Sequence, residues 1–264
     1  MGGFALVIQP DEEEPEAAEV LVDGSVGGRH YRFLLDTGAA KSAILSDDYT
    51  ATFAAIGQHT SSGVFAGGSE DEVIAPTIEV GPIVRRDFPV TRLAENIPQR
   101  RNLIGMDLLK GYRCHFLFDE NRVEIDGDDL PGASFYDLAL DSRFHPYVPL
   151  CFGAVTASTV WDTGAGITVA DCGFVARHPT LFQPADPSEG TDATGDGGRS
   201  GYASSSGKSE GCRSAWRRRC SRLRTACTLS AGVGSCSGGV PASSSMTLRP
   251  TANRNHMFHS EHMV

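Results

Sequence analysis

The sequence Leu-Leu-Asp-Thr-Gly-Ala at residues 34–39 decides the fold, because a close copy, Val-Trp-Asp-Thr-Gly-Ala, recurs at residues 160–165. Each copy follows a run of alternating apolar residues, and each is followed by a short apolar segment, at residues 42–45 and 167–170. An alternating run that ends in Asp-Thr-Gly predicts a β-strand leading into a tight loop. The two copies are 126 residues apart, so the sequence predicts an internal repeat.

Chance is a poor explanation of this repeat. One Asp-Thr-Gly after a strand is an ordinary turn sequence. From average residue frequencies, one copy in a chain of this length has a probability of roughly 0.05, and two copies of about 0.001. The matching apolar residues and the Ala after each Gly lower that probability further. We therefore interpret the two copies as the halves of one site.

Two Asp residues in equivalent loops suit a reaction in which water attacks a carbonyl carbon. One carboxylate takes a proton from the water, and the other carboxyl group donates a proton to the carbonyl oxygen. The two groups must therefore lie about 3 Å apart and share one proton. A hydroxyl after each Asp can lock the loops together, and a Gly lets the backbone approach the carboxylate. The candidate catalytic residues are Asp36 and Asp162, and the supporting residues are Thr37, Gly38, Thr163 and Gly164.

The first repeat also contains a long hairpin. Residues 57–72 are rich in Gly, Ser and acids, which predicts a hairpin with a Gly-rich tip and a mobile flap at residues 59–72. An ordinary surface hairpin is the alternative. The candidate flap and substrate-binding residues are Gly63, Val64, Phe65 and Gly67. Many short strands at close spacing with Gly turns predict an all-β protein.

A third feature follows the hairpin. Residues 102–109 read Asn-Leu-Ile-Gly-Met-Asp-Leu-Leu, an apolar-apolar-Gly segment before a short helical turn. With this order of features, residues 19–126 resemble a retropepsin-like (retroviral-type) aspartic peptidase. The resemblance implies a closed β-barrel of the acid-protease type, peptide cleavage by an activated water, and neither a metal nor an organic cofactor. It also implies that Asp36 and Asp162 are the catalytic pair.

The chain organisation lies between two plans. Retroviral units are single lobes that dimerise, whereas pepsin-like enzymes carry two larger lobes in one chain. Here we expect two short lobes related by a pseudo-twofold axis. The pepsin-like interpretation is weaker because the repeat offset is short and neither a disulfide pattern nor a secretion signal is present. The expected parts are an acidic N-terminal segment at 1–18, a first lobe at 19–130, a partial second lobe at 131–195 and a low-complexity, disordered tail at 196–264.

Charge and composition limit the kinds of partner that we expect this chain to bind. Residues 196–264 carry ten Lys and Arg and three acids, so residues 1–195 carry thirteen and thirty, within a net charge of −10. This acidic body argues against nucleic acid as a partner. No apolar run is long enough to span a membrane, and the N-terminus lacks a secretion-signal pattern, so we expect a cytoplasmic protein.

No metal site is expected from the Cys and His residues. The spacing of the seven cysteines matches no zinc pattern. His256, His259 and His262 have ligand-like spacing, but they lie in the aberrant tail and are better interpreted as part of a solvated terminus.

Two functions remain open from the sequence. The first is an endopeptidase that acts on an extended peptide or protein substrate beneath the flap. The second is a catalytically inactive retropepsin-like fold that serves as a peptide-binding or interaction module. A homodimer through the first lobe is a further option, because the second lobe is incomplete.

The tail generates a prediction about the gene. From about residue 196 the strand alternation ends, and neither a second flap nor a second copy of the 103–105 segment is recognisable. We predict that residues from about 195 onward are an out-of-frame translation of a GC-rich gene, or an equivalent truncation. Such a composition buries too little apolar surface to offset its ordering entropy. The nucleotide sequence is the measurement: another frame after codon 195 should encode a flap-like hairpin and an apolar-apolar-Gly segment, and their absence contradicts the prediction.

Overall fold

The computed structural model confirms the all-β prediction in the residues that it describes. These are residues 2–10, 17–62, 67–93, 100–126, 139–152, 154–166, 169–170, 172–184, 188–191, 197–200, 203–204, 227–230 and 245–248. The helices of this part are only α1 (Met106–Leu109), α2 (Cys172–Arg177) and three 3-10 turns, η1 (Thr50–Thr52), η2 (Phe118–Glu120) and η3 (Pro179–Leu181). No helix in the described ranges is long and apolar enough to cross a membrane.

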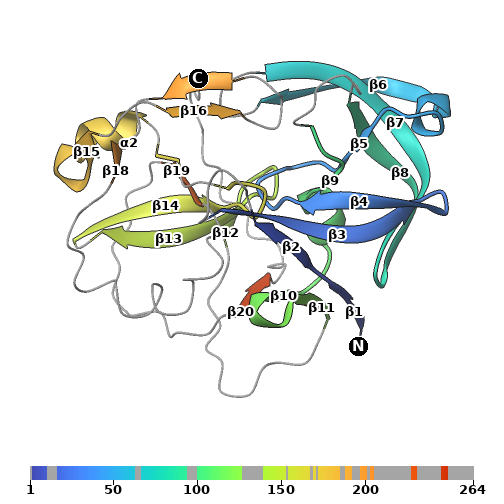
Figure 1. Cartoon of the computed structure of the whole chain (residues 1–264), viewed down its shortest axis with the longest axis horizontal. Coiled ribbons are helices and arrows are strands. Elements are labelled where there is room, and N and C mark those ends of the chain that lie inside the picture. Colours follow the sequence, from blue (N-terminus) through green and yellow to red (C-terminus); the bar gives the residue numbers. More distant parts are fainter. Residues whose placement is uncertain are drawn as a thin grey trace.

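The first lobe is built on one eight-stranded sheet, in the order β2-β3-β4-β9-β5-β8-β7-β6 (Figure 1). Its strands are β2 (Val7–Pro10), β3 (Ala18–Val26), β4 (Arg29–Leu35), β5 (Ala43–Leu45), β6 (Ala55–Ser62), β7 (Gly67–Val80), β8 (Ile83–Leu93) and β9 (Leu103–Ile104). The pairs β4–β9 and β5–β8 are parallel, and the other pairs are antiparallel.

This sheet curls on itself without closing. β3 also pairs with β7, through Ser25–Glu79 and Val26–Ile78, which brings distant strands of the sheet together. Among the described strands, the two outer ones, β2 and β6, do not pair with each other. The expectation of a closed barrel is therefore wrong in this detail: the strands wrap around a core, and the sheet keeps two edges.

The core of the first lobe lies inside the curl. Alternation along each strand sends every second side chain inward, and this is why the apolar residues of the strands meet. The fully buried residues include Val22, Phe33, Leu35, Ile44, Ile78, Val90, Ile104 and Phe116. Leu108 and Leu109 of α1 join the same core, so the short helix packs beneath the sheet that carries the first Asp-Thr-Gly loop.

Two further sheets complete the body. One has the order β1-β11-β10-β20 and contains β1 (Gly2–Ala5), β10 (Cys114–Leu117), β11 (Arg122–Ile125) and β20 (Ser245–Leu248). The other has the order β12-β13-β14-β19 and contains β12 (Ala139–Leu140), β13 (Pro146–Phe152), β14 (Val155–Trp161) and β19 (Cys227–Ser230). Residues 2–10 thus form strands, although the sequence indicated only an acidic N-terminal segment.

A similar hairpin precedes each of the two Asp-Thr-Gly loops. β4 (Arg29–Leu35) and β14 (Val155–Trp161) have bounds that differ by 126 residues at both ends, and each pairs antiparallel with the preceding strand. In Figure 1, β3–β4 and β13–β14 extend to opposite sides of the centre of the molecule. The same local sequence pattern therefore builds the same hairpin in both halves.

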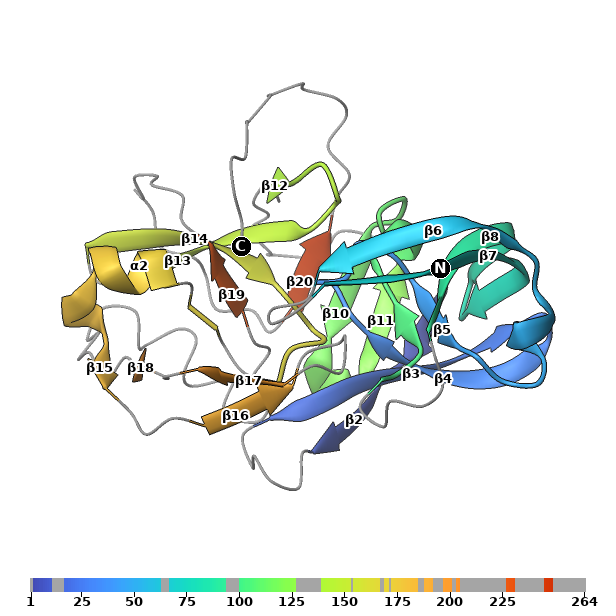
Figure 2. The ribbon, with the colours of Figure 1, turned by 90° about the horizontal axis from the view of Figure 1, so that it is seen from above.

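The second half contains a hairpin that the sequence analysis did not expect. β16 (Ser188–Thr191) and β17 (Gly197–Ser200) pair antiparallel, and a separate two-stranded pair joins β15 (Gln183–Pro184) to β18 (Ala203–Ser204). In Figure 1, β16–β17 and β6–β7 lie on the same upper side of the molecule, and Figure 2 shows them from above. The sequence analysis recognised no second flap, and β16–β17 is a hairpin that it did not predict.

The expected disorder of residues 196–264 stays a prediction, and the structure describes only four short segments of this range. The segments 197–200, 203–204, 227–230 and 245–248 are strands. β19 pairs with β14, and β20 pairs with β10. The physical reason is that a strand edge offers unpaired N–H and C=O groups that any extended backbone can satisfy, whatever its side-chain pattern. The other residues of the tail lie outside the described part.

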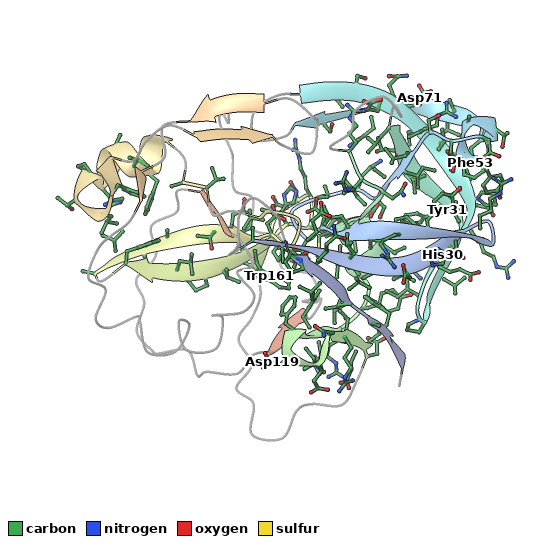
Figure 3. All side chains as sticks on the ribbon, viewed as in Figure 1. His30, Tyr31, Phe53, Asp71, Asp119 and Trp161 are labelled. Atoms are coloured by element: carbon green, nitrogen blue, oxygen red, sulfur yellow. The ribbon has the colours of Figure 1, made fainter. Side chains whose placement is uncertain are left out.

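An aromatic cluster joins the two halves. Trp161, the last residue of β14, is 2% exposed and belongs to the core of the first lobe. Its ring meets Phe116 edge-on at 4.8 Å between centroids, and Phe118 at 6.5 Å. Figure 3 labels Trp161 near the centre of the molecule, beside β14. The second half is thus anchored in the core of the first, directly before its Asp-Thr-Gly loop.

Trp161→Ala should therefore destabilise the fold by about 3–5 kcal/mol, the usual cost of removing a large buried aromatic side chain. Urea denaturation followed by far-UV circular dichroism measures the change. The matched control is Ile56→Ala, because Ile56 is 54% exposed and should change the free energy of unfolding by no more than about 0.5 kcal/mol. Equal effects of the two substitutions would contradict the anchoring role of Trp161.

Candidate active site

The two Asp-Thr-Gly loops meet face to face. A Cβ atom on Gly38 would lie 2.3 Å from Oδ2 of Asp162, and a Cβ atom on Gly164 would lie 2.4 Å from Cγ of Asp36. The backbone of each loop thus lies against the carboxyl group of the other loop. This explains the Gly at both positions, because any side chain there would displace the opposite carboxyl group. The structure brings together Asp36, Asp162, Gly38 and Gly164.

The two threonines bind the loops together reciprocally. The hydroxyl of Thr37 accepts from the backbone N–H of Thr163 at 3.0 Å and donates to the carbonyl of Trp161 at 2.6 Å. The hydroxyl of Thr163 accepts from the backbone N–H of Thr37 at 3.1 Å and donates to the carbonyl of Leu35. Both threonines are buried. We call these four hydrogen bonds the threonine grip.

Each carboxyl group is also held by its own loop. Oδ1 of Asp36 accepts from the N–H of Ala39 at 2.8 Å, and Oδ1 of Asp162 accepts from the N–H of Gly164 at 2.8 Å. These bonds aim the two carboxyl groups at the meeting point of the loops. Asp36 is only 7% exposed, so water reaches it from a restricted direction.

Burial and mutual repulsion dominate the electrostatics of the pair. Burial raises the pKa of Asp36 well above its usual value, and the neighbouring charge of Asp162 raises it further. Burial also raises the pKa of Asp162. Two carboxylates in contact cannot both ionise easily, so the pair retains a shared proton at a pH where an isolated Asp is ionised.

Residues 102–107 brace the first loop from below. β9 lies parallel to β4, and the N–H of Leu34 donates to the carbonyl of Asn102 at 2.8 Å. The N–H of Asp36 donates to the carbonyl of Ile104 at 2.9 Å, and the N–H of Met106 donates to the carbonyl of Ala39 at 2.9 Å. The segment that carried part of the family resemblance therefore fixes the backbone on both sides of Asp36.

Asp107 is a supporting residue that the sequence analysis did not single out. Its carboxylate accepts from the N–H of Ser42, at 2.9 and 3.0 Å, and from the Ser42 hydroxyl at 2.7 Å. The same hydroxyl accepts from the N–H of Gly105 at 3.0 Å. Burial raises the pKa of Asp107 above its usual value. A carboxylate inside the apolar run Met-Asp-Leu-Leu was the sequence signal that could have revealed it.

The second loop has a different support. β19 lies beside β14 in the place that β9 occupies beside β4, but it runs antiparallel, with Trp161 opposite Cys227. Within the described ranges, no segment contacts the second loop as residues 105–107 contact the first. The threonine grip and the Trp161 cluster are therefore its main described anchors.

The predicted hairpin is present as β6–β7, with Ser62 opposite Gly67 at its described end. Gly67 is the first residue of β7, while Gly63, Val64 and Phe65 lie outside the described residues. Glu72 of β7 forms an ion pair with Lys41 of the first loop. One arm of the hairpin is thus tied to the loop that carries Asp36.

Metal ligands do not gather in the part of the chain that the structure describes: it contains no cluster of three or more His, Cys, Asp or Glu residues suited to hold a metal ion. The polar groups of the site are instead the two carboxyl groups, the two hydroxyls and the backbone N–H groups that surround them.

Comparison with known proteins agrees with this geometry. Residues 22–111 match the family model described as "gag-polyprotein putative aspartyl protease". No curated protein matches the chain in a sequence search. The match covers β4, the first Asp-Thr-Gly loop, the β6–β7 hairpin and the brace at residues 102–107. The matched segment, residues 22–111, is similar to retropepsin-like aspartic peptidases.

The threonine grip generates a prediction about stability. Thr37→Val keeps the side-chain volume but leaves the N–H of Thr163 and the carbonyl of Trp161 without their partner, so it should cost about 2–4 kcal/mol. Thr37→Ser keeps the hydroxyl and should cost about 1 kcal/mol or less. Chemical denaturation measures both values. If Val and Ser variants were equally stable, the grip would contribute nothing to the fold.

Proposed function

We propose that this protein is an aspartic endopeptidase whose catalytic pair is Asp36 and Asp162. The observation that carries the proposal is the reciprocal contact of each loop Gly with the opposite carboxyl group, in a site where both pKa values are raised. Thr37 and Thr163 are positioning residues, because they hold the loops and do not touch the reacting atoms.

The proposed reaction uses one water molecule and one shared proton. The ionised carboxylate of the pair takes a proton from the water, whose oxygen attacks the carbonyl carbon of the peptide bond. The protonated carboxyl group donates its proton to the carbonyl oxygen, giving a tetrahedral intermediate. Collapse of this intermediate breaks the C–N bond: the leaving nitrogen takes the proton that the first carboxyl group had removed from the water, and a hydroxyl of the intermediate returns a proton to the second carboxylate as the carbonyl re-forms. The pair returns to its singly protonated state.

The substrate we propose is an extended peptide between the β6–β7 hairpin and the catalytic loops. The hairpin would cover the bound chain and exclude water. Because the threonine grip forms within one chain, it supports a one-chain active site in preference to a homodimer of first lobes. The peptide enters and leaves without a metal or organic cofactor in this proposal.

A non-catalytic peptide-binding module is the second candidate. One observation favours it: the described residues brace the Asp36 loop fully, whereas the Asp162 loop receives less support. A pair with one loosely held member could retain the cleft while losing turnover, because a misplacement of about 1 Å can cost a hundredfold in rate. The two candidates differ in whether peptide bonds are broken.

Asp36→Asn should abolish peptide cleavage, by several orders of magnitude, because it removes both the shared proton and the base. A peptide-library digest by the full chain, analysed by mass spectrometry, measures cleavage. Wild-type activity should be greatest below neutral pH, where the pair is singly protonated. The matched control is Asp48→Asn, whose side chain is 82% exposed and which should cleave normally. Undiminished cleavage by Asp36→Asn would overturn the assignment.

The same variant should change the pH dependence of stability. A carboxyl group whose folded pKa is raised binds more protons in the folded state, so wild-type stability should fall as pH rises from about 4 through the pKa of the pair. Asp36→Asn removes the repulsion within the pair, so its melting temperature should fall less over that range. Melting curves between about pH 4 and 8 show whether the two slopes differ, and identical slopes would contradict the shared proton.

A further inference from the structure

A pocket of about 360 Å³ lies beside the loop that carries Asp36. Its volume suits one or two amino-acid side chains and lies at the small end of the range for ligand pockets. Phe88 and Pro89 of β8 form an apolar wall. The polar residues that line it are Lys41, Arg85, Asp107 and Lys110.

Two cations of this pocket have no acidic partner in the described part of the chain. Arg85 donates to the hydroxyl of Tyr112 at 2.6 Å and lies 4.9 Å from the centre of its ring. Lys110 has its ammonium group 3.9 Å from the ring centre of Phe144. Both contacts fix a positive charge without neutralising it. This is unusual in a chain with a net charge of −10.

The two acidic side chains discussed above, Asp107 and Glu72, already have hydrogen-bond or ion-pair partners. Asp107 accepts three hydrogen bonds from Ser42, and burial raises its pKa. Glu72 pairs with Lys41. The net character of the pocket is therefore positive, and the uncompensated charge belongs to Arg85 and Lys110.

The pocket is linked to the hairpin through Lys41. Lys41, which lines it, lies five residues after Asp36 and binds Glu72 on the β7 arm. Lys41 also lies near the opposite arm: burial, and then the ammonium group of Lys41, lower the pKa of His59 on β6. An extended peptide lying beneath the hairpin would pass this group of charges as it leaves the site.

We propose that this pocket, which we call the cationic pocket, binds an acidic side chain of the substrate, with Arg85 and Lys110 as the residues that select it. The inference rests on the proposed peptide-cleaving function and adds the class of substrate: peptides with Glu or Asp some residues from the scissile bond. The carboxylate would sit between the guanidinium and the ammonium groups, and the stem of the side chain would lie on Phe88 and Pro89. Charge-assisted hydrogen bonds of this kind are stronger than neutral ones.

The test uses binding, so that it does not depend on turnover. A random peptide library is selected on immobilised full-length Asp36→Asn protein, and the bound peptides are sequenced. Acidic residues should be enriched about three- to tenfold at one position. Adding Arg85→Gln and Lys110→Gln to the same protein should remove that enrichment, and either substitution alone should reduce it. No enrichment, or equal enrichment in the triple variant, would overturn the proposal.

Arg86→Gln is the matched control for Arg85→Gln. It removes the same charge from the adjacent residue of β8, whose side chain is exposed on the other face of the strand, so the enrichment should remain. A loss of enrichment with Arg86→Gln would show a general charge effect and overturn the pocket assignment. Cleavage by the wild-type chain is recorded separately. If acidic selection depends on Arg85 and Lys110 but no peptide is cleaved, the pocket stands and the peptidase proposal fails.

Discussion

The threonine grip is the interaction on which the rest of the site depends. Each hydroxyl accepts a hydrogen bond from a backbone N–H of the other loop and donates one to a backbone carbonyl of the strand that precedes the other loop. These groups are buried, so none of them can exchange its partner for water without a large cost. The grip therefore fixes the separation of the two loops, and the contacts between each Gly and the opposite carboxyl group follow from that separation.

The two halves reach this junction with unequal support. The loop of Asp36 is held from below by β9, by Gly105 and by the Ser42–Asp107 pair. Among the described residues, the loop of Asp162 is held by the grip and by Trp161, which lies in the core of the other half. Within the described part of the chain, the first half thus supplies most of the contacts at this junction and serves as the template for the second. This division agrees with the family match, which covers the template alone.

The sequence predicted the parts of the structure that local pattern controls. Alternation before Asp36 and Asp162 gave both strands, and the residue types after each Asp indicated a locking hydroxyl and a close backbone approach. The hairpin β16–β17 and the pairing of β19 and β20 could not be predicted in this way. The strands β19 and β20 pair with open backbone edges of β14 and β10, and such edges leave no side-chain pattern in the segments that pair with them. The strands of the β16–β17 hairpin, Ser-Glu-Gly-Thr and Gly-Gly-Arg-Ser, carry no apolar alternation that could announce them. Asp107 was missed for another reason: its partner, Ser42, is 65 residues away.

The distance along the chain between Asp36 and its partner has a consequence for biosynthesis. Every member of the grip from the second half lies at or beyond residue 161, so a nascent chain that ends earlier holds one carboxylate in a braced loop and nothing opposite it. The two carboxyl groups can meet only after the ribosome has made the second Asp-Thr-Gly loop, which follows most of the described body. Under the proposed function, the chain cannot cleave peptide bonds while residues 1–160 emerge from the ribosome, because the pair of carboxyl groups does not yet exist.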